Sequence, residues 1–296
     1  MRRRNQLSQK AFPYLMCTPA LIVFTVFVIA PFIVGIVTSF FRWDGISPMK
    51  FIGFNNYIWS FEDSTFWLSI KHTVIYAFFV TILKNVVGLG LGMIMVKQKF
   101  MKSFFRVSAY LPVTFSYVVI GVLWAWIYNP IFGLLNKMLE GMGLSGWIQG
   151  WLSDPKIALY SIMAVDVWKW MGFHMVLYMA GLQSISKDLY EAADIDGANR
   201  WKKFWHVTVP QLNSTLVLNI VMSITGAFMT NYNLVKVMTD GGPYSSTEVA
   251  LTYIVRTAFT NSALGKANAM SIILFCFVFV FAFFQLKVMT RDDYYE

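Results

Sequence analysis

Asp166 and Lys169 are two charged residues inside a long apolar stretch of the sequence. Charges among apolar residues are costly, so they usually face a bundle interior or a water-filled cavity. Spaced three residues apart on a helix, these two can form a local ion pair with each other. Alternatively, they can hold a polar ligand by charge-assisted hydrogen bonds, with the ring of Trp170 covering its apolar side. Lys84, alone in another apolar segment, is a further candidate for a cavity wall.

A second set of chemically useful residues lies further along the chain. One helix face carries small and polar side chains at positions i, i+4, i+8 and i+11: Asn219, Ser223, Ala227 and Thr230. Such a face can line a polar pathway, or it can pack against another helix through hydroxyl hydrogen bonds. The glycines of residues 88–92 similarly predict a small face for close helix packing.

Several catalytic signatures are absent from the sequence. There is no GxxxxGK[ST] motif, so the chain cannot hold a nucleoside triphosphate through a P-loop. The pattern GxGxxG occurs at residues 141–146, but no strand precedes it and no helix follows to receive a pyrophosphate. The histidines lack metal-ligand spacing, and the two cysteines lie in separate apolar segments. We expect no catalytic residue, no metal and no cofactor.

The composition indicates that the solvent of this chain is a lipid bilayer. Of its 296 residues, 57% are hydrophobic and only 13% are charged, whereas soluble domains carry about 25% charged residues. The net charge of +9 could suggest nucleic acid, but the basic residues lie in short loops between apolar segments rather than on one basic face. We therefore expect no nucleic-acid partner.

Six segments are long and apolar enough to cross a hydrocarbon layer of about 30 Å as helices. They cover about residues 14–40, 73–96, 107–128, 157–184, 211–233 and 267–286. Prolines predict kinks in the first segment, at Pro19 and Pro31, and in the third, at Pro112. The expected fold class is all-α, a polytopic membrane protein with six transmembrane helices.

The distribution of lysine and arginine predicts the orientation of these helices. Fourteen basic residues fall in the N-terminus, the loop after the second span, the loop after the fourth span and the C-terminus. Seven lie on the opposite side: Arg42, Lys50, Lys137, Lys156, Lys236, Arg256 and Lys266. Because cytoplasmic loops are enriched in these residues, we expect both termini, residues 1–13 and 289–296, to be cytoplasmic.

The loop at residues 187–210 is too rich in helix-forming and apolar residues to be a simple linker. Residues 189–195 favour a helix, and Gly197 supplies a turn before a second short segment with an apolar side. Two interpretations are open at this level. The second segment can rest on the membrane surface as an amphipathic helix, or the loop can dock a cytoplasmic partner.

The motifs of this loop and of five other segments resemble those of the permease subunits of ATP-binding-cassette (ABC) importers, of the carbohydrate-uptake type. The loop has Glu-Ala-Ala at 191–193, Gly197 and Val-x-Val-Pro at 207–210, similar to the EAA loop of that family. The other segments are FIGFNNY at 51–57, WLSDP at 151–155, DVWKWMGF at 166–173, AGLQSI at 180–185 and TDGGP at 239–243. The chain resembles the maltose-type permease half that begins with a long, proline-containing first helix.

The resemblance implies a mechanism and a set of partners. Residues 14–288 would form the transmembrane domain, and the EAA loop at 187–210 would couple it to a separate cytoplasmic ATPase dimer. The coupling residues would be Glu191, Ala192, Ala193, Asp196, Gly197, Ala198 and Pro210. The other implied partners are a second permease subunit, an extracytoplasmic solute-binding protein, a sugar and membrane lipid, in a bacterial cytoplasmic membrane.

The resemblance also assigns a role to the polar residues within the spans. Asp166, Lys169, Trp170, Asn219, Ser223, Ala227 and Thr230 would line the substrate pathway. Two other classes of function are weaker alternatives. A secondary transporter is expected to show broken paired repeats or a relay of buried carboxylates, and a membrane-embedded enzyme needs a catalytic constellation, which the spans lack.

Overall fold

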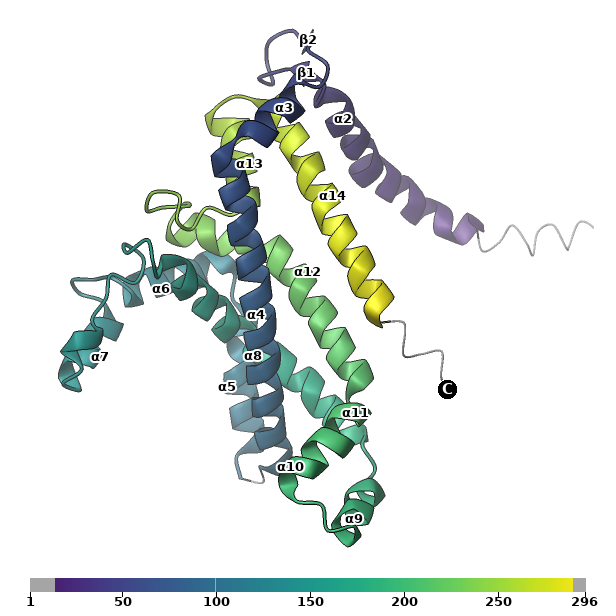
Figure 1. Ribbon diagram of the computed structural model, residues 1–296, viewed down its shortest axis with the longest axis vertical. Helices are drawn as coiled ribbons and strands as arrows, with labels where there is room; N and C mark the ends of the chain where they lie inside the picture. The colour runs from purple at the N-terminus through teal and green to yellow at the C-terminus, as the bar shows by residue number, and fades with distance from the viewer. Residues whose placement is uncertain (1–13, 99, 290–296) are drawn as a thin grey trace, which may run out of the picture. The chain divides into compact units, whose positions relative to one another are not determined.

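The computed structural model describes residues 14–98 and 100–289, and over these ranges the chain is almost wholly helical. The two strands in this part of the chain, β1 (Phe41–Arg42) and β2 (Lys50–Phe51), form a short antiparallel pair in which Phe41 faces Phe51. The predicted all-α class is therefore confirmed (Figure 1). The expected cytoplasmic ends at 1–13 and 290–296 lie outside the described residues.

The chain divides into two compact units. The first contains residues up to Ser64 together with Ile254–Phe279, and the second contains Thr65–Tyr253 together with the residues from Val280 onward.

The first unit is built on a long helical segment, Tyr14–Thr38. Within it, Thr25–Ile29 is a π-helical turn (η1), and α2 (Ala30–Thr38) follows. This wider turn stands just before Pro31, whose ring would clash with the preceding turn and which has no N–H to donate. At Pro19, by contrast, the helix continues without interruption.

The rest of the first unit packs around the end of that helix. It comprises α3 (Asn55–Glu62), η4 (Arg256–Thr260) and the first part of α14 (Leu264–Met289). Asn268 on α14 donates a hydrogen bond of 2.6 Å to the hydroxyl of Thr38, and the rings of Phe32 and Phe275 lie 5.2 Å apart. These contacts connect the first helical segment to α14.

The second unit holds the larger core. Its helices are α4 (Ser64–Lys97), α5 (Lys102–Thr114), α6 (Tyr117–Ile127), α7 (Leu134–Gly141), α8 (Ala158–Ser184), α12 (Asn213–Met238) and α13 (Ala250–Val255), with a short 3₁₀ turn at Ser145–Trp147 (η2). Buried apolar residues such as Tyr76, Ile162 and Leu234 join α4, α8 and α12 in one cluster. Gly88 and Gly92 allow α4 to approach the backbone of α8 closely, as expected for a small face.

The third expected span is not one kinked helix. Instead of a single helix over residues 107–128, α5 ends at Thr114 and α6 begins at Tyr117, with an angle of 102° between them. The break lies beyond Pro112, at Phe115 and Ser116, which have extended backbone. Ser116 caps α6 by accepting a hydrogen bond of 3.3 Å from the N–H of Val119. The proline therefore stands within α5, and the side-chain cap starts a new helix in another direction.

Several helices are long and apolar enough to span a membrane. Four meet both criteria, Tyr14–Thr38, Ser64–Lys97, Asn213–Met238 and Leu264–Phe283, and the bent α5–α6 pair would make a fifth. Helix α8, the expected fourth span, has 27 residues but is too polar to meet the same criteria. The described residues thus form a polytopic helical protein with four or five such spans.

Candidate functional site

A buried ion pair connects α4 and α8 inside the second unit. Lys84 Nζ lies 2.9 Å from Asp166 Oδ2, and these side chains are 3% and 0% exposed. The structure therefore differs from the local pairing of Asp166 with Lys169 that the i, i+3 spacing allowed. Helix packing supplies Asp166 with a cation from another helix, which sequence spacing along α8 could not indicate.

Lys169 is held by backbone carbonyls at the break between α5 and α6. Its ammonium donates hydrogen bonds to the carbonyl oxygens of Pro112, Val113 and Phe115, at 3.1, 3.1 and 2.6 Å. It also lies 4.9 Å from the ring centre of Tyr117, where a cation is attracted by the aromatic face. Carbonyls at the end of a helix lack intrahelical partners, so Lys169 satisfies the groups that the break leaves free.

A cavity of about 360 Å³ lies beside these charges, between α4, α8 and α12. Its polar lining includes the ends of Lys84, Trp170, His174, Ser223 and Thr230. The ring of Trp170 faces the ammonium of Lys84 at 5.8 Å, while its N–H donates to the hydroxyl of Tyr117 at 2.7 Å. One cavity therefore offers an ammonium, hydroxyls and an indole ring, a combination suited to a polar ligand with one apolar face.

A hydrogen-bond network orders the wall of this cavity. The amide nitrogen of Asn219 donates to the carbonyl of Thr215, which turns its Oδ1 toward His174 Nδ1 at 2.8 Å. His174 Nδ1 must then carry the proton, and Nε2 can accept from the hydroxyl of Ser223 at 3.3 Å. Asn85 donates to the same Ser223 oxygen at 3.0 Å. The polar atoms that face the cavity are thus oriented in advance.

The predicted pathway residues separate into two groups in this geometry. Trp170, Ser223 and Thr230 line the cavity. Asp166, Lys169, Asn219 and Ala227 are buried away from it, in contact with other helices or with the backbone. His174 and Asn85 are not among the pathway residues predicted from the sequence. The sequence did contain a signal for each. His174 is four residues from Trp170 on the same helix face, and Asn85 directly follows Lys84.

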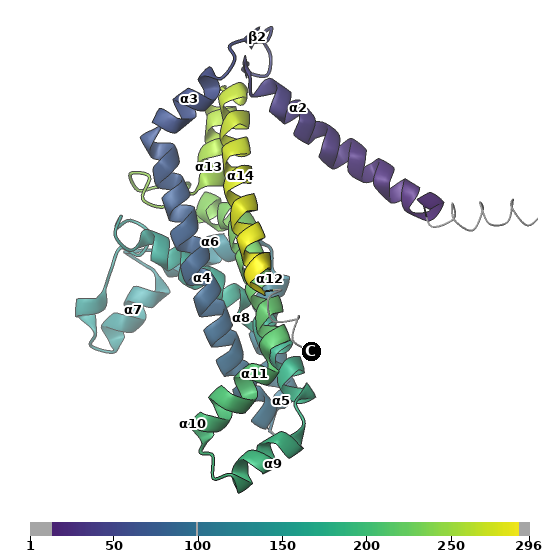
Figure 2. The ribbon, with the colours of Figure 1, turned by 45° about the vertical axis from the view of Figure 1, so that its right-hand side comes forward.

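The loop between α8 and α12 folds into a helical hairpin at one end of the second unit (Figure 1 and Figure 2, green). It comprises α9 (Lys187–Ile195), α10 (Arg200–Lys203), a π-helical turn at Phe204–Thr208 (η3) and α11 (Val209–Gln211). Ser186 caps α9, and Asn199 caps α10 by accepting from the N–H of Lys202 at 2.9 Å. As before Pro31, the π turn precedes a proline, here Pro210.

Gly197 ends α9 in a left-handed conformation, with φ of +70°. The N–H of Ala198 donates to the carbonyl of Ala193, and the N–H of Gly197 donates to that of Asp194. These two bonds form a Schellman motif, in which glycine is favoured because a side chain strains this backbone. Asp194 also pairs with Lys203 at 2.6 Å, which closes the hairpin across the turn.

The outer surface of this hairpin is exposed. Glu191, Ala192, Asp196, Gly197 and Pro210 are exposed, and Ala193 and Ala198 are half-buried. Large apolar side chains accompany them, with Ile195 87% and Trp201 69% exposed. Exposed apolar residues of this size beside acidic ones are typical of a surface that another molecule covers.

A helical chain with several apolar spans, a cavity between its helices that a few polar side chains enter, and a capped hairpin at one end has the features of a membrane transport subunit. The family model described as "binding-protein-dependent transport system inner membrane component" matches residues 84–289. The chain belongs to this family, and it is therefore an inner-membrane component of such a transport system.

Individual relatives match almost the whole chain. It is 37% identical over 281 residues to the probable ABC transporter permease protein YurN of Bacillus subtilis, covering 94% of this chain and 96% of YurN. It is 31% identical to the probable starch degradation products transport system permease protein AmyD of Thermoanaerobacterium thermosulfurigenes, covering 95% and 94% of the two chains. Both matches extend beyond the region covered by the family model.

The fold is shared with a solved transporter. A chain in the crystal structure of a bacterial alginate ABC transporter, in complex with an alginate pentasaccharide-bound periplasmic protein, matches with a TM-score of 0.84. The match is 23% identical in sequence and covers 99% of this chain and 98% of the other. At this identity, the likeness concerns the fold.

Proposed function

We propose that this chain is one of two membrane subunits of an ABC importer and that it carries a sugar or oligosaccharide across the cytoplasmic membrane. The observation that carries the proposal is the cavity between α4, α8 and α12, in which Lys84, Trp170, Ser223 and Thr230 converge. A relative named for the transport of starch degradation products and a transporter solved with an alginate-bound partner support a saccharide as the solute.

The residues of the pathway have distinct roles in this proposal. Trp170 covers the apolar face of a sugar ring, and Ser223 and Thr230 bond its hydroxyls. Asp166 holds Lys84, and Asn219 holds His174, so both act as positioning residues. Lys169 fixes the break between α5 and α6, and Ala227 allows α12 to pack closely behind the cavity.

The proposed membrane arrangement has six spans and cytoplasmic termini. Helix α8 is the sixth span, because its charged side chains are buried within the second unit rather than exposed to lipid. The hairpin at 187–210 is then cytoplasmic. A second permease half completes the pathway, and an extracytoplasmic solute-binding protein delivers the sugar on the other side.

The hairpin is the proposed contact with a separate ATPase dimer. Glu191 is exposed and can accept a charge-assisted hydrogen bond from a basic group. Ala192, Ala193 and Ala198 keep the docking face small, and Asp196, Gly197 and Pro210 set the directions of the short helices. The exposed ring of Trp201 favours a docking surface over a solvated loop, since a partner would cover it.

Transport can be tested with the full chain reconstituted in proteoliposomes together with its second permease, ATPase and solute-binding protein. We expect ATP-dependent uptake of a saccharide, with maltotriose and an alginate trisaccharide as probes and glycine as a control solute. Ser223→Leu fills the cavity and is expected to reduce uptake at least tenfold, whereas Ser214→Leu, exposed on the same helix, leaves it unchanged. Transport by this chain alone, or only of glycine, would contradict the proposal.

Coupling can be tested separately in the same vesicles. Gly197→Pro cannot adopt the observed φ of +70°, and Glu191→Lys reverses the charge of the proposed docking face. Each is expected to uncouple ATP hydrolysis from uptake while the helices remain inserted. Glu140→Lys makes the same charge change at an exposed site outside the hairpin and serves as the control. Unchanged uptake in both hairpin variants would exclude the proposed coupling role.

A further inference from the structure

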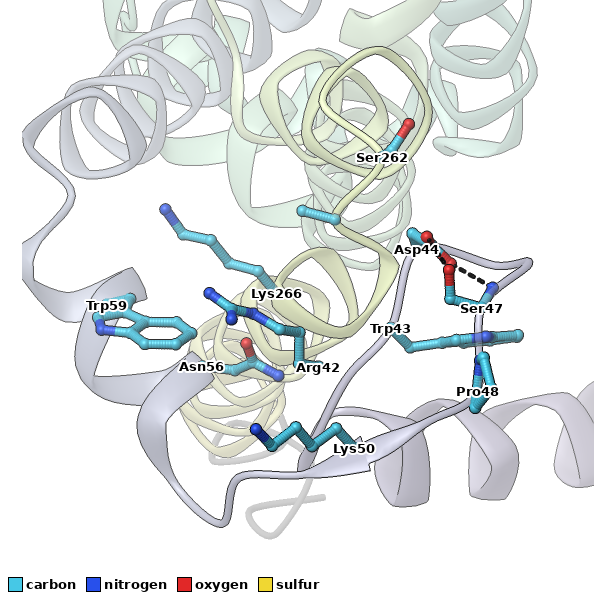
Figure 3. A pocket seen from close by; sticks show the side chains of 11 residues that line it. Arg42, Trp43, Asp44, Ser47, Pro48, Lys50, Asn56, Trp59, Ser262 and Lys266 are labelled. Carbon is cyan, nitrogen blue, oxygen red and sulfur yellow. Dashed lines mark hydrogen bonds between the residues drawn. The ribbon is translucent and has the colours of Figure 1, made fainter.

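A second cavity, of about 570 Å³, lies in the first unit and has no part in the proposed pathway (Figure 3). Three cationic side chains line it, Arg42, Lys50 and Lys266, together with the indole rings of Trp43 and Trp59. The volume is within the range of about 300–1,000 Å³ that small-ligand sites occupy. The lining combines positive charge with aromatic surface.

The backbone around this cavity is firmly held. Asn56 is buried, and its amide donates to the carbonyls of Ser39 and Phe41 at 2.8 and 2.9 Å. The N–H of Gly265 donates to the carbonyl of Trp43 at 3.1 Å. A Cβ at Gly265 would lie 2.0 Å from the carbonyl oxygen of Phe41, so only glycine permits this approach. The cavity is therefore a formed site between the 41–50 loop, α3 and the start of α14.

The positive charge of the cavity is only partly neutralised. Lys266 pairs with Asp63 at 2.7 Å. The carboxylate of Asp44, which also lines the cavity, accepts from the N–H groups of Ile46 and Ser47 and from the Ser47 hydroxyl. These bonds lower the pKa of Asp44 to about 2, so the carboxylate is ionised at neutral pH. Its oxygens already accept hydrogen bonds from this loop.

The remaining two cations have no carboxylate partner within ion-pair distance in the described part of the chain. Arg42 instead lies 5.8 Å from the ring centre of Trp59. Lys50 lines the same cavity (Figure 3). An anion entering the cavity would therefore meet a guanidinium and an ammonium that are both free to bind it. Arginine can bind a phosphate by two parallel hydrogen bonds, and lysine binds it as a point charge.

The cavity lies where two apolar helices end. The first helical segment finishes at Thr38, four residues before Arg42, and α14 begins at Leu264, two residues before Lys266. The most apolar 18-residue stretch of that first segment has no buried residue, as expected of a helix facing lipid. Bulky apolar side chains such as Ile46, Phe51 and Phe54 are exposed near the cavity. Tryptophans and exposed apolar residues at the end of a span indicate the headgroup level of a membrane.

We propose that this cavity binds the headgroup of an anionic phospholipid, with its phosphate between Arg42 and Lys50 and its glycerol against the ring of Trp59. The excess of basic residues lies in cytoplasmic loops in most membrane proteins. Three of the seven basic residues expected on the outer side nevertheless gather here. A ligand explains this cluster, whereas topology does not. This proposal rests on the proposed function only where it places the cavity at the outer leaflet of the membrane.

The test is lipid binding to the full-length chain in a neutral detergent, measured by native mass spectrometry. Phosphatidylglycerol and phosphatidylcholine with the same acyl chains are the probes. We expect phosphatidylglycerol to bind more tightly than phosphatidylcholine. Arg42→Gln/Lys50→Gln should weaken its binding about 25-fold, since each basic residue near an anionic surface contributes roughly fivefold. Arg42→Lys/Lys50→Arg keeps both charges and should retain most of the binding.

The matched control is Lys137→Gln/Lys156→Gln, which removes two exposed basic residues of the same expected side but outside the cavity. It should leave the preference for phosphatidylglycerol intact. Equal loss in this control, or no loss in Arg42→Gln/Lys50→Gln, would overturn the proposal. So would soluble glycerol phosphate binding as tightly as the lipid, which would indicate a site for a free phosphate.

A protein occupant gives a different result. If lipid binding is unchanged in Arg42→Gln/Lys50→Gln while the affinity for the solute-binding protein falls, the cavity is a protein-docking site and the lipid proposal is wrong. The lipid-binding measurement involves no transport, so its outcome is independent of whether this chain carries a sugar.

Discussion

The ammonium of Lys84 lies 2.9 Å from the carboxylate of Asp166, and 82 residues of sequence separate the two. Both side chains are buried, and the second carboxylate oxygen of Asp166 has no hydrogen-bond partner among the described residues. A buried pair of this kind is costly to break, because removing one partner leaves an uncompensated charge in an apolar interior. The pair also keeps the Lys84 ammonium at the wall of the cavity between α4, α8 and α12.

Asp166→Asn should therefore destabilise the chain strongly. It leaves Lys84 buried and unpaired, and the expected loss is about 3–5 kcal/mol in the free energy of unfolding. Replacing both members, as in Lys84→Met/Asp166→Leu, should recover most of this stability. Thermal unfolding in detergent, followed by tryptophan fluorescence, measures the difference. A suitable control is Lys236→Met, which breaks the half-exposed pair with Asp240 and should cost about 0–1 kcal/mol. Equal losses in the single and double variants would contradict this account.

Lys169→Met should loosen the break between α5 and α6. The substitution removes a charged donor from three carbonyls, at an expected cost of roughly 2–3 kcal/mol. The local consequence is faster amide hydrogen exchange at residues 112–120, measured by mass spectrometry. Lys97→Met changes an exposed lysine at the end of α4 and should leave this exchange unaltered. Protection that persists in Lys169→Met would show that the break is held by other contacts.

The two glycines Gly88 and Gly90 should respond oppositely to alanine. A Cβ at Gly88 would lie 2.6 Å from the Cβ of His174, whereas nothing lies within 4 Å of one at Gly90. Gly88→Ala is expected to cost about 1–3 kcal/mol by overpacking α4 against α8. Gly90→Ala should instead stabilise the helix by roughly 0.5–1 kcal/mol, because glycine loses more entropy on folding. Unfolding temperatures that move in the same direction would argue against the observed α4–α8 contact.

Gly197→Ala should strain the turn between α9 and α10 without a steric clash. The position has open space around it, but its φ of +70° costs an alanine about 1–2 kcal/mol. We expect faster hydrogen exchange at residues 194–199 and weaker ATP-dependent uptake, with unfolding of the transmembrane helices unchanged. Gly146→Ala has the same open surroundings and no positive φ, so it should behave as the unsubstituted chain. Full uptake in Gly197→Ala would show that the turn tolerates the altered geometry.

Features that depend on neighbouring residues could be predicted from the sequence alone. The apolar lengths predicted a helical membrane protein, and the spacing of Asn219, Ser223 and Thr230 predicted a polar face on one helix. Gly197 predicted the turn that ends α9, and its φ is indeed positive. The motifs predicted the family that the family model confirms. Each of these properties is local, because chain length, helical periodicity and backbone freedom do not depend on distant parts of the chain.

The partners of the buried polar groups were decided by the tertiary structure. Spacing along α8 allowed Asp166 to pair with Lys169, but the packing of α4 places Lys84 beside Asp166 instead. Lys169 bonds carbonyls that become available only where α5 ends and α6 turns away by 102°. Carbonyls are present in every residue and leave no signature in a sequence. The sequence thus determined which charges are buried, and the three-dimensional packing determined which groups neutralise them, since a buried charge takes the nearest partner that the fold supplies.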